Sequence, residues 1–419
     1  MLHQCPYAID PSGADVHAEA ARLRALGPAT PVTLPGGVDA WAVAGLADLK
    51  RLMTDDRVSK DAYRHWPAWI NGEIEGNWPL AIWVSVRNMI TAYGSEHTRL
   101  RKLVAPTFTM RRVAAMRPRI ERITSGLLDR LAALPPDRPV DLRAEFAHQL
   151  PTHVTFELFG IPEEFWEPLH RITQSFFDTK ISLEDAQENG ALLHSTMAQL
   201  VARKREHPGD DVTSGLIAAR DDENGARLSE KELVDNLILL FTAGYETSVN
   251  LISSCIHAML THPEQLALVR AGDAGWEDVI EETLRHEPPA ATGILRYAVE
   301  EIDLHGTVIP KGAPIAVSYA GAGRDPSVHG QHADRFDITR PTRGDHISFG
   351  FGTHYCVGAP LARLEVRIGL EALFGRFPEL ALACPPDRLR RIESFISNGH
   401  RELPVLLGPE KQGRNQASA

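Results

Sequence analysis

Apolar residues recur with the helical period through most of residues 98–260, interrupted by the turn-forming sequences LPPDRP and HPGDDV. The first hundred residues combine a helical segment, 14–26, with short β-like segments such as TPVTLPGG and AWAVAG. Alternation with turn signals returns in IDLHGTVIPKGAPIAVSYA, which predicts strands. The pattern therefore predicts a mainly α protein with a smaller β region.

The longest predicted helix covers residues 230–261, without an internal proline. Ser229 and Glu232 form a capping box at its start, in which each side chain satisfies a free backbone donor. At 1.5 Å per residue the helix is about 48 Å long, enough to cross a domain. Its centre reads TAGYETS instead of a purely apolar run. Gly244 weakens a helix there and Thr247 can bond back to a carbonyl, so we expect a functional distortion, although such back-bonding is common in buried helices.

The composition narrows the class of protein. The chain has 419 residues, 43% of them hydrophobic and 24% charged, with no low-complexity linker. Length alone suggests roughly two or three average domains, but the uniform composition favours fewer, with a core large enough to enclose a cofactor. Residues 409–419 are polar, and we expect them to form a disordered tail.

The formal net charge of −11 argues against nucleic acid or an anionic membrane as the main partner. One segment, from residue 99 to 122, is basic instead. It holds one acid, Glu121, and eight basic residues: Arg99, Arg101, Lys102, Arg111, Arg112, Arg117, Arg119 and Arg122. Such a segment is usually a solvated helical face, but it can also be a docking surface for an acidic protein.

The four cysteines, Cys5, Cys255, Cys356 and Cys384, have no CxxC spacing and do not form a disulfide framework, which suits a reducing cytosol. The N-terminus MLHQCPYAIDPSG lacks the basic and apolar regions of a signal peptide. No run of about 18 apolar residues predicts a membrane span. We therefore expect a soluble, cytoplasmic protein without a nucleic-acid or membrane partner.

The segment ISFGFGTHYCVGAPLARLE places Cys356 on a glycine-rich turn before a helix. Free backbone donors and the helix dipole favour a thiolate there, and Gly350, Gly352 and Gly358 allow a bulky group to approach. Zinc would need further ligands, and only His354 is near in sequence. A cysteine nucleophile would need a base, for which His354 is again the neighbour. A thiolate ligand of haem iron needs no other protein ligand.

Several motifs resemble those of the cytochrome P-450 family. Residues 349–358 match its haem-binding signature in full, and AGYETS, residues 243–248, resembles its oxygen-activation motif. HTRLR, residues 97–101, resembles its haem-propionate motif. EETLRHEP contains a Glu-x-x-Arg motif, and ADRF, residues 333–336, resembles the family's Pro-Glu-Arg-Phe segment without its proline. The resemblance covers nearly the whole chain. It implies one cytochrome P-450 domain over residues 1–408, with haem between the long central helix and the cysteine loop.

The resemblance implies a role for each matched residue. Cys356 would be the axial ligand of the haem iron, and Glu246 with Thr247 would be the acid–alcohol pair of catalysis. The implied haem contacts are His97, Arg101, Ala243, Arg296, Phe349, Gly350, His354 and Gly358. The implied structural network is Glu282, Arg285 and Arg335. The implied substrate contacts are Trp83, Met89, Leu239, Ala243, Thr292, Ile294 and Ile396.

The implied cofactors are haem b, dioxygen as co-substrate, and NAD(P)H acting through a ferredoxin and its reductase. The implied reaction is hydroxylation of a bulky apolar substrate, a steroid ahead of a macrolide. Trp66, Trp69, Trp78 and Trp83 fall in the family's loop over the distal haem face, and we expect two or three of them to anchor the core.

Two other functions are alternatives to this hydroxylase. A peroxide-driven peroxygenase of the family typically has arginine and proline where this chain has Glu246 and Thr247. A haem-based sensor or carrier would not need an acid–alcohol pair.

Overall fold

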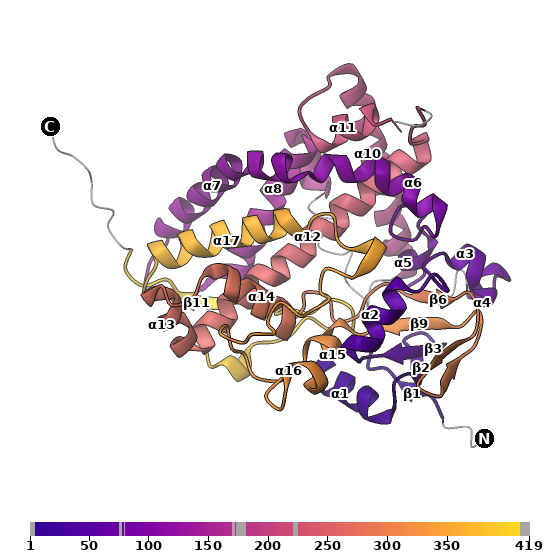
Figure 1. Cartoon of the computed structure of the whole chain (residues 1–419). Helices are drawn as coiled ribbons and strands as arrows, with labels where there is room; N and C mark the ends of the chain where they lie inside the picture. Colours follow the sequence, from indigo (N-terminus) through magenta and orange to yellow (C-terminus); the bar gives the residue numbers. More distant parts are fainter. Residues whose placement is uncertain are drawn as a thin grey trace.

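The computed structural model describes residues 5–74, 78, 80–169, 172, 182–220 and 225–410, and omits the side chains of four further residues, 82, 83, 183 and 186. Helices fill one side of the molecule and the largest sheet lies at the other side, near the N-terminus (Figure 1). This arrangement confirms the predicted mainly α architecture. Residues 411–419 of the predicted tail lie outside the described residues. That tail, and a single domain over residues 1–408, stay predictions.

The helices follow the apolar periodicity of the sequence. Their bounds are α1 (Val16–Leu26), α2 (Leu46–Thr54), α3 (Ala62–His65), α4 (Pro67–Ile70), α5 (Ile82–Ser85), α6 (Ser95–Val104), α7 (Met110–Ala132), α8 (Gln149–Phe159), α10 (Leu183–Glu206), α11 (Val212–Ala218), α12 (Glu230–Thr261), α13 (Pro263–Ala271), α14 (Trp276–His286), α15 (Tyr319–Gly323), α16 (Pro326–His329) and α17 (Ala359–Arg376). Single turns are η1 (Ala105–Phe108), the π-helix η2 (Arg143–Ala147), η3 (Glu163–Phe165), η4 (Gly352–His354) and η5 (Pro386–Arg388).

The described strands form three sheets. Their bounds are β1 (Tyr7–Ala8), β2 (Thr30–Leu34), β3 (Val38–Val43), β4 (Val58–Ser59), β5 (Val140–Asp141), β6 (Arg296–Ala298), β7 (Ile302–Leu304), β8 (Thr307–Ile309), β9 (Pro314–Val317), β10 (Ala381–Leu382) and β11 (Pro404–Leu406). The largest sheet has the order β1-β2-β3-β9-β6-β4, so it joins the N-terminal strands to strands from the last third of the chain. The two smaller sheets have the orders β10-β11-β5 and β7-β8.

The helix α12 organises the helical side. It begins at the predicted capping box, where Ser229 and Glu232 bond each other's backbone N–H groups, and it runs unbroken to Thr261. The expected distortion is limited to a back-bond in which the Thr247 hydroxyl donates to the carbonyl of Ala243, 2.8 Å away. The helix packs against α8, α14 and α17 (Figure 1). Among the described residues, no helix is both long and apolar enough to span a membrane.

Candidate active site

A cavity of about 260 Å³ lies against the middle of α12. Ala243, Gly244 and Thr247 line it, and the first two are exposed although most of the helix around them is buried. Their spacing places them on one helix face. The cavity is also lined by the cysteine loop and the start of α17, including Phe349, Gly350, His354, Cys356, Gly358 and Leu361. The long helix and the cysteine turn thus face the same space.

The turn before α17 holds Cys356 against this cavity. Its backbone N–H donates to the Phe349 carbonyl, 2.8 Å away, which closes the loop. Gly352 has a φ of +70°, and a Cβ there would lie 2.9 Å from the Met53 carbonyl oxygen, so a side chain does not fit. The sulfur is open to the cavity but lies deep in the protein.

Two opposing effects act on the Cys356 thiol. Burial raises its pKa, whereas the N–H groups of Gly358 and Ala359, which donate to the sulfur, lower it together with Arg101 and Arg363. Donors at a helix start and two cations stabilise a thiolate once a metal ion compensates for burial. This arrangement of the thiol suits a metal ligand. In the described part of the chain, no group of three or more His, Cys, Asp or Glu side chains forms an alternative metal centre.

Basic side chains gather beside the cysteine loop. Lys60, His97 and Arg296 are 7%, 5% and 2% exposed, and the rings of His97 and His354 lie 3.9 Å apart between centroids. Arg101 donates to the carbonyl of Tyr355, 2.6 Å away. The segments that carry these groups lie far apart in sequence. The fold therefore concentrates positive charge at this end of the cavity.

Burial and mutual repulsion destabilise the positive charges of this basic cluster. Burial, together with the positive charges of Arg101 and Lys60, lowers the pKa of His97 to about 4. Burial also holds the pKa of Lys60 well below its ordinary value, helped by Arg296 and Arg101. The Nε2 atom of His97 and the Nε atom of Arg296 lie buried without a hydrogen-bond partner among the described residues. Buried polar nitrogens of this kind need a hydrogen-bond partner, which an anionic group can provide.

These observations fit a haem group. Its two propionates are anions that would meet the basic cluster, and the Cys356 sulfur would supply the thiolate that holds the haem iron. Gly350 has a φ of +75°, and a Cβ there would lie 3.2 Å from the His354 carbonyl oxygen, so the glycine lets the loop close tightly on itself. The structure places six of the predicted haem contacts in or beside this space: His97, Arg101, Arg296, Phe349, His354 and Gly358.

The predicted acid–alcohol pair is divided between two faces of α12. Thr247 lines the cavity. Glu246 does not line it, because its carboxylate accepts a hydrogen bond from Arg143 of η2 at 2.8 Å. Arg143 also donates to Asn250, one turn further along α12, at 2.9 Å. Burial raises the pKa of Glu246, and the Arg143 guanidinium opposes this rise.

The Glu-x-x-Arg motif forms a buried network. Glu282 and Arg285 are both fully buried, and Arg285 donates two hydrogen bonds to the Glu282 carboxylate, at 2.7 and 2.6 Å. Arg285 also donates to the carbonyls of Gly323, Ala333 and Arg335.

The prediction for the Arg335 side chain is wrong. Arg335 is exposed, and only its backbone carbonyl joins the network. The third partner is Arg340, which is 8% exposed and lies 3.6 Å from the Glu282 carboxylate. The reason is the turn at residues 332–335, which directs the carbonyl inward and the Arg335 side chain outward.

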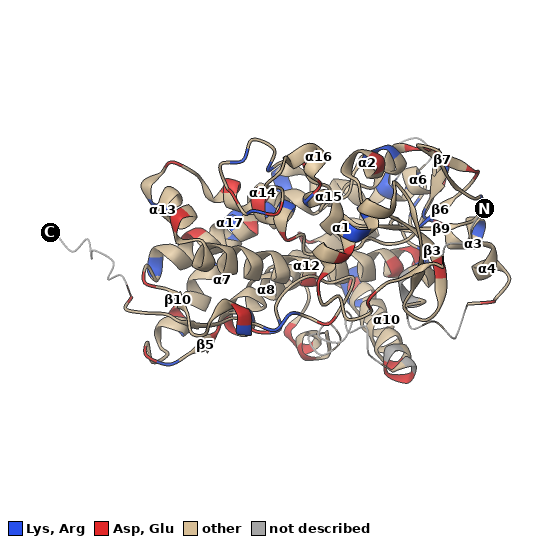
Figure 2. Ribbon diagram, turned by 90° about the horizontal axis from the view of Figure 1, so that it is seen from below, with Lys and Arg blue, Asp and Glu red and all other residues tan. Residues whose placement is uncertain are grey.

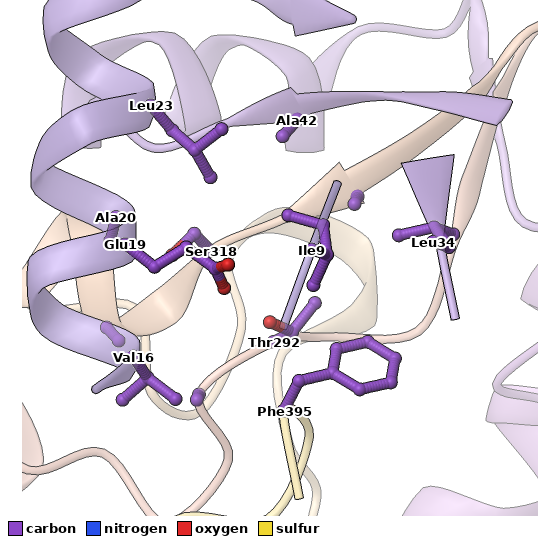
Figure 3. Close-up of a pocket in the computed structure, with 13 residues that line it drawn as sticks. Ile9, Val16, Glu19, Ala20, Leu23, Leu34, Ala42, Thr292, Ser318 and Phe395 are labelled. Carbon is purple, nitrogen blue, oxygen red and sulfur yellow. The ribbon is translucent and has the colours of Figure 1, made fainter. Parts of the chain in front are cut away.

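The predicted substrate contacts are only partly brought together. Met89, Leu239 and Ala243 line the large cavity, but Thr292, Ile294 and Ile396 do not. Thr292 lines a separate pocket of about 30 Å³, where it lies near Phe395 and Ile9 (Figure 3). A β-bridge to Ser318 ties Thr292 to the residue that follows β9.

The tryptophan-rich segment is mostly a structural anchor. Trp66, Trp69 and Trp78 are 3%, 2% and 3% exposed and belong to the core beside the large sheet. The rings of Trp66 and Trp69 stack with centroids 5.9 Å apart. This agrees with the expectation that two or three of the rings anchor the loop. The Trp83 side chain lies outside the described residues, so its substrate contact stays a prediction.

Four site residues have no signal in the sequence that identifies them: Lys60, Arg143, Tyr319 and Arg340. Each reaches its place through contacts between distant segments. Tyr319, for example, lines the cavity from α15, and the hydroxyl lies so close to Gly293 that a Cβ there would be 2.6 Å from it.

A glycine-cradled thiol, a basic cluster and a long helix with a threonine facing the cavity define a haem–thiolate protein. A family model described as Cytochrome P450 matches residues 163–271 and 276–396. The chain belongs to the cytochrome P450 family and is a P450 monooxygenase.

Three relatives illustrate the similarity. The chain is 47% identical to 2-hydroxy-5-methyl-1-naphthoate 7-hydroxylase of Streptomyces carzinostaticus, over 96% of this chain and 98% of the relative. It is 41% identical to 6-deoxyerythronolide B hydroxylase of Saccharopolyspora erythraea, over 92% and 95% respectively. A solved structure described as testerone-bound CYP154C4, from a Streptomyces species, is 43% identical with a TM-score of 0.93, over 98% of this chain and 100% of that one.

Proposed function

We propose that this P450 binds haem b through Cys356 and uses dioxygen to hydroxylate a bulky, mostly apolar substrate. The observation that carries the proposal is the single cavity surface shared by the Cys356 sulfur, the Thr247 hydroxyl and apolar side chains such as Met89 and Leu239. A haem bound by a thiolate supplies the activation of dioxygen. The protein must position the substrate, exclude water and deliver protons.

Thr247 and Glu246 carry the proposed proton delivery. The Thr247 hydroxyl faces the cavity while it donates to the Ala243 carbonyl, so its oxygen remains able to accept a further hydrogen bond. Glu246 holds its carboxylate on the neighbouring face of α12, bound to Arg143. A positioned proton donor is typically worth 10²–10⁴-fold in rate. This pair favours the monooxygenase over the peroxygenase and over the sensor or carrier.

We infer a rigid polycyclic or macrocyclic substrate, with a steroid as the first candidate. The cavity wall combines many apolar groups with few polar ones, the lining that suits such a ligand. Two relatives support this class by their names, the macrolactone hydroxylase and the testerone-bound CYP154C4. The name of the naphthoate hydroxylase adds a bicyclic aromatic acid as a second candidate.

A spectral titration of the haem-loaded protein tests the substrate. Testosterone or progesterone should shift the spin state at micromolar concentration, and a small polar compound such as a free amino acid should not. Macrolactones and 2-hydroxy-5-methyl-1-naphthoate serve as the other arms. If only the small polar compound gives the shift, the apolar substrate class is wrong. Turnover with ferredoxin and NAD(P)H, compared with peroxide alone, separates the monooxygenase from its two alternatives.

We propose that Arg111 and Arg112 help to dock an acidic ferredoxin, which receives electrons from NAD(P)H through its reductase. Acidic and basic residues are interspersed over most of the ribbon (Figure 2). Within the basic segment, Arg99, Arg117 and Arg122 are engaged with Glu96 and Glu232, with Glu121 and with Glu157. Arg111 and Arg112 are exposed and form no ion pair with another described residue.

Reversal of both charges, Arg111→Glu with Arg112→Glu, should slow electron transfer from the ferredoxin and flatten its salt dependence. Arg203→Glu is the matched control, because Arg203 is an exposed cation already paired with Glu164. Peroxide-supported turnover does not need the ferredoxin, so it distinguishes slower electron transfer from damage to the fold. If that turnover drops as much as the ferredoxin-supported rate, the docking proposal is wrong.

A further inference from the structure

An ion pair joins α14 to α17 beside the cysteine loop, and it has no part in the mechanism proposed above. The two helices pack against each other (Figure 1). Arg363 of α17 donates two hydrogen bonds to the Glu281 carboxylate of α14, from Nε at 2.5 Å and from Nη2 at 3.0 Å. Such a two-pronged contact holds the guanidinium in one orientation. The Arg363 and Glu281 side chains are 33% and 23% exposed, so solvent screens their charges only in part.

The same guanidinium contacts the cysteine loop at two aromatic residues. Its central carbon lies 4.5 Å from the centroid of the Phe349 ring, which is a cation–π contact. Its Nη1 atom donates to the Tyr355 hydroxyl, 3.4 Å away. The Phe349 carbonyl in turn accepts the hydrogen bond from the Cys356 backbone N–H that closes the loop. The position of Arg363 is therefore linked directly to the position of the loop that carries the thiol.

Glu281 also binds the segment that leads into the cysteine loop. The Nε2 atom of His346 lies 3.1 Å from its Oε2 atom, and the Ser348 hydroxyl donates to the Leu284 carbonyl of the same helix at 2.5 Å. Burial raises the pKa of Glu281, but the hydrogen bonds with His346 and Arg363 outweigh burial and lower this pKa to about 2. Glu281 is therefore an ionised carboxylate near neutral pH, and it balances the charge of Arg363.

The charge of Arg363 acts on the Cys356 thiol. Burial raises the pKa of this thiol, and Arg363 and Arg101 are the two cations that oppose the rise. Arg101 belongs to the basic cluster that would meet the haem propionates, whereas Arg363 is held by Glu281 on the other helix. A cation near a redox centre stabilises the state with the extra electron, and a nearby anion has the opposite effect.

We propose that the Arg363–Glu281 ion pair sets the reduction potential of the iron that Cys356 binds. Both members are positioning residues, because they act through the cysteine loop and its thiolate. Arg363 favours the ferrous state, and Glu281 offsets part of this effect while it holds the guanidinium against the Phe349 ring. The inference rests on the proposed binding of haem iron by Cys356.

Redox titration of the haem-loaded protein, without substrate or ferredoxin, tests this proposal. Arg363→Gln removes the cation and leaves the Glu281 carboxylate without its partner, so the midpoint potential should fall. Glu281→Gln leaves the Arg363 charge without its counter-ion, so the potential should rise. We expect each variant to change the ferric-to-ferrous ratio by about tenfold, which is about 59 mV for a one-electron couple. Simple damage to the loop would move both potentials in the same direction, so opposite signs identify a charge effect.

Arg367→Gln is the matched control, because Arg367 pairs with Glu277 between the same two helices, one turn further along α17 from Cys356. Its potential should stay close to that of the unmodified protein. Shifts of the two test variants that share a sign, or that do not exceed the shift of the control, overturn the proposal. If one test variant fails to bind haem, the other, compared with the control, decides the result. Absence of the red-shifted carbon monoxide band from the unmodified protein would overturn the proposed haem binding as well, whereas a normal band with unmoved potentials contradicts only this inference.

Discussion

Replacement of Arg340 by leucine should destabilise the protein far more than the same change at Arg335. The Arg340 guanidinium donates to the carbonyls of His329, His332 and Arg335, at 2.8, 2.6 and 3.1 Å. It also lies 3.6 Å from the Glu282 carboxylate. The leucine side chain would leave these carbonyls and part of the charge of Glu282 without their partner in the interior.

Loss of one partner of a buried ion pair costs about 3–5 kcal/mol. Arg285 still holds Glu282 by two hydrogen bonds, so we expect the lower end, about 3 kcal/mol, or roughly a hundredfold in the unfolding equilibrium. With a urea slope of about 3 kcal/mol per molar, the unfolding midpoint should fall by about 1 M. Arg335→Leu removes an exposed side chain and keeps the carbonyl, so its effect should stay within about 0.5 kcal/mol.

The assay is urea unfolding of the haem-loaded protein, followed by circular dichroism, for both variants and the unmodified chain. Equal shifts of the urea unfolding midpoint for the two variants would refute the reasoning. A larger shift for Arg335→Leu would show that the Arg335 guanidinium belongs to the network around Glu282. A normal carbon monoxide spectrum before denaturation confirms that each variant is folded around its haem.

Four further outcomes are expected. Cys356→Ser should abolish the red-shifted carbon monoxide band of the reduced protein, and a surviving band would assign the iron to another ligand. Thr247→Ala should lower product per NAD(P)H more than it lowers NAD(P)H consumption, whereas unchanged coupling would remove the hydroxyl from proton delivery. Arg143→Leu removes the cation that opposes the rise in the pKa of Glu246, so the pH profile of product yield should move to higher pH. An unchanged pH profile would show that the Arg143–Glu246 pair takes no part in catalysis. Burial lowers the pKa of His400 to about 3, so its contribution to stability is present above its unfolded pKa of about 6.5 and is lost as the pH falls toward 3. His400→Gln should weaken this acid destabilisation in urea titrations at a series of pH values, and identical pH profiles would contradict the assignment.

Local chemistry allowed much of the site to be predicted from the sequence. The capping box at Ser229 and the apolar period after it define α12, because both depend on residues within a few turns of each other. The glycines around Cys356 define the turn, because positive φ values and close backbone approach are properties of single residues. Glu282 and Arg285 lie three residues apart on one helix, so their contact also follows from spacing alone.

The tertiary structure decided which groups complete these local motifs. Arg340 rather than Arg335 meets Glu282, and Arg143 draws Glu246 away from the cavity, because buried charges pair with whichever cation the packing brings near. The same is true of Lys60, which comes from the end of β4 and meets residues of α6 and β6 only in the folded chain. The sequence alone does not show whether a charged residue is exposed or buried. Its role is fixed by desolvation and by partners distant in the chain, and these exist only after folding.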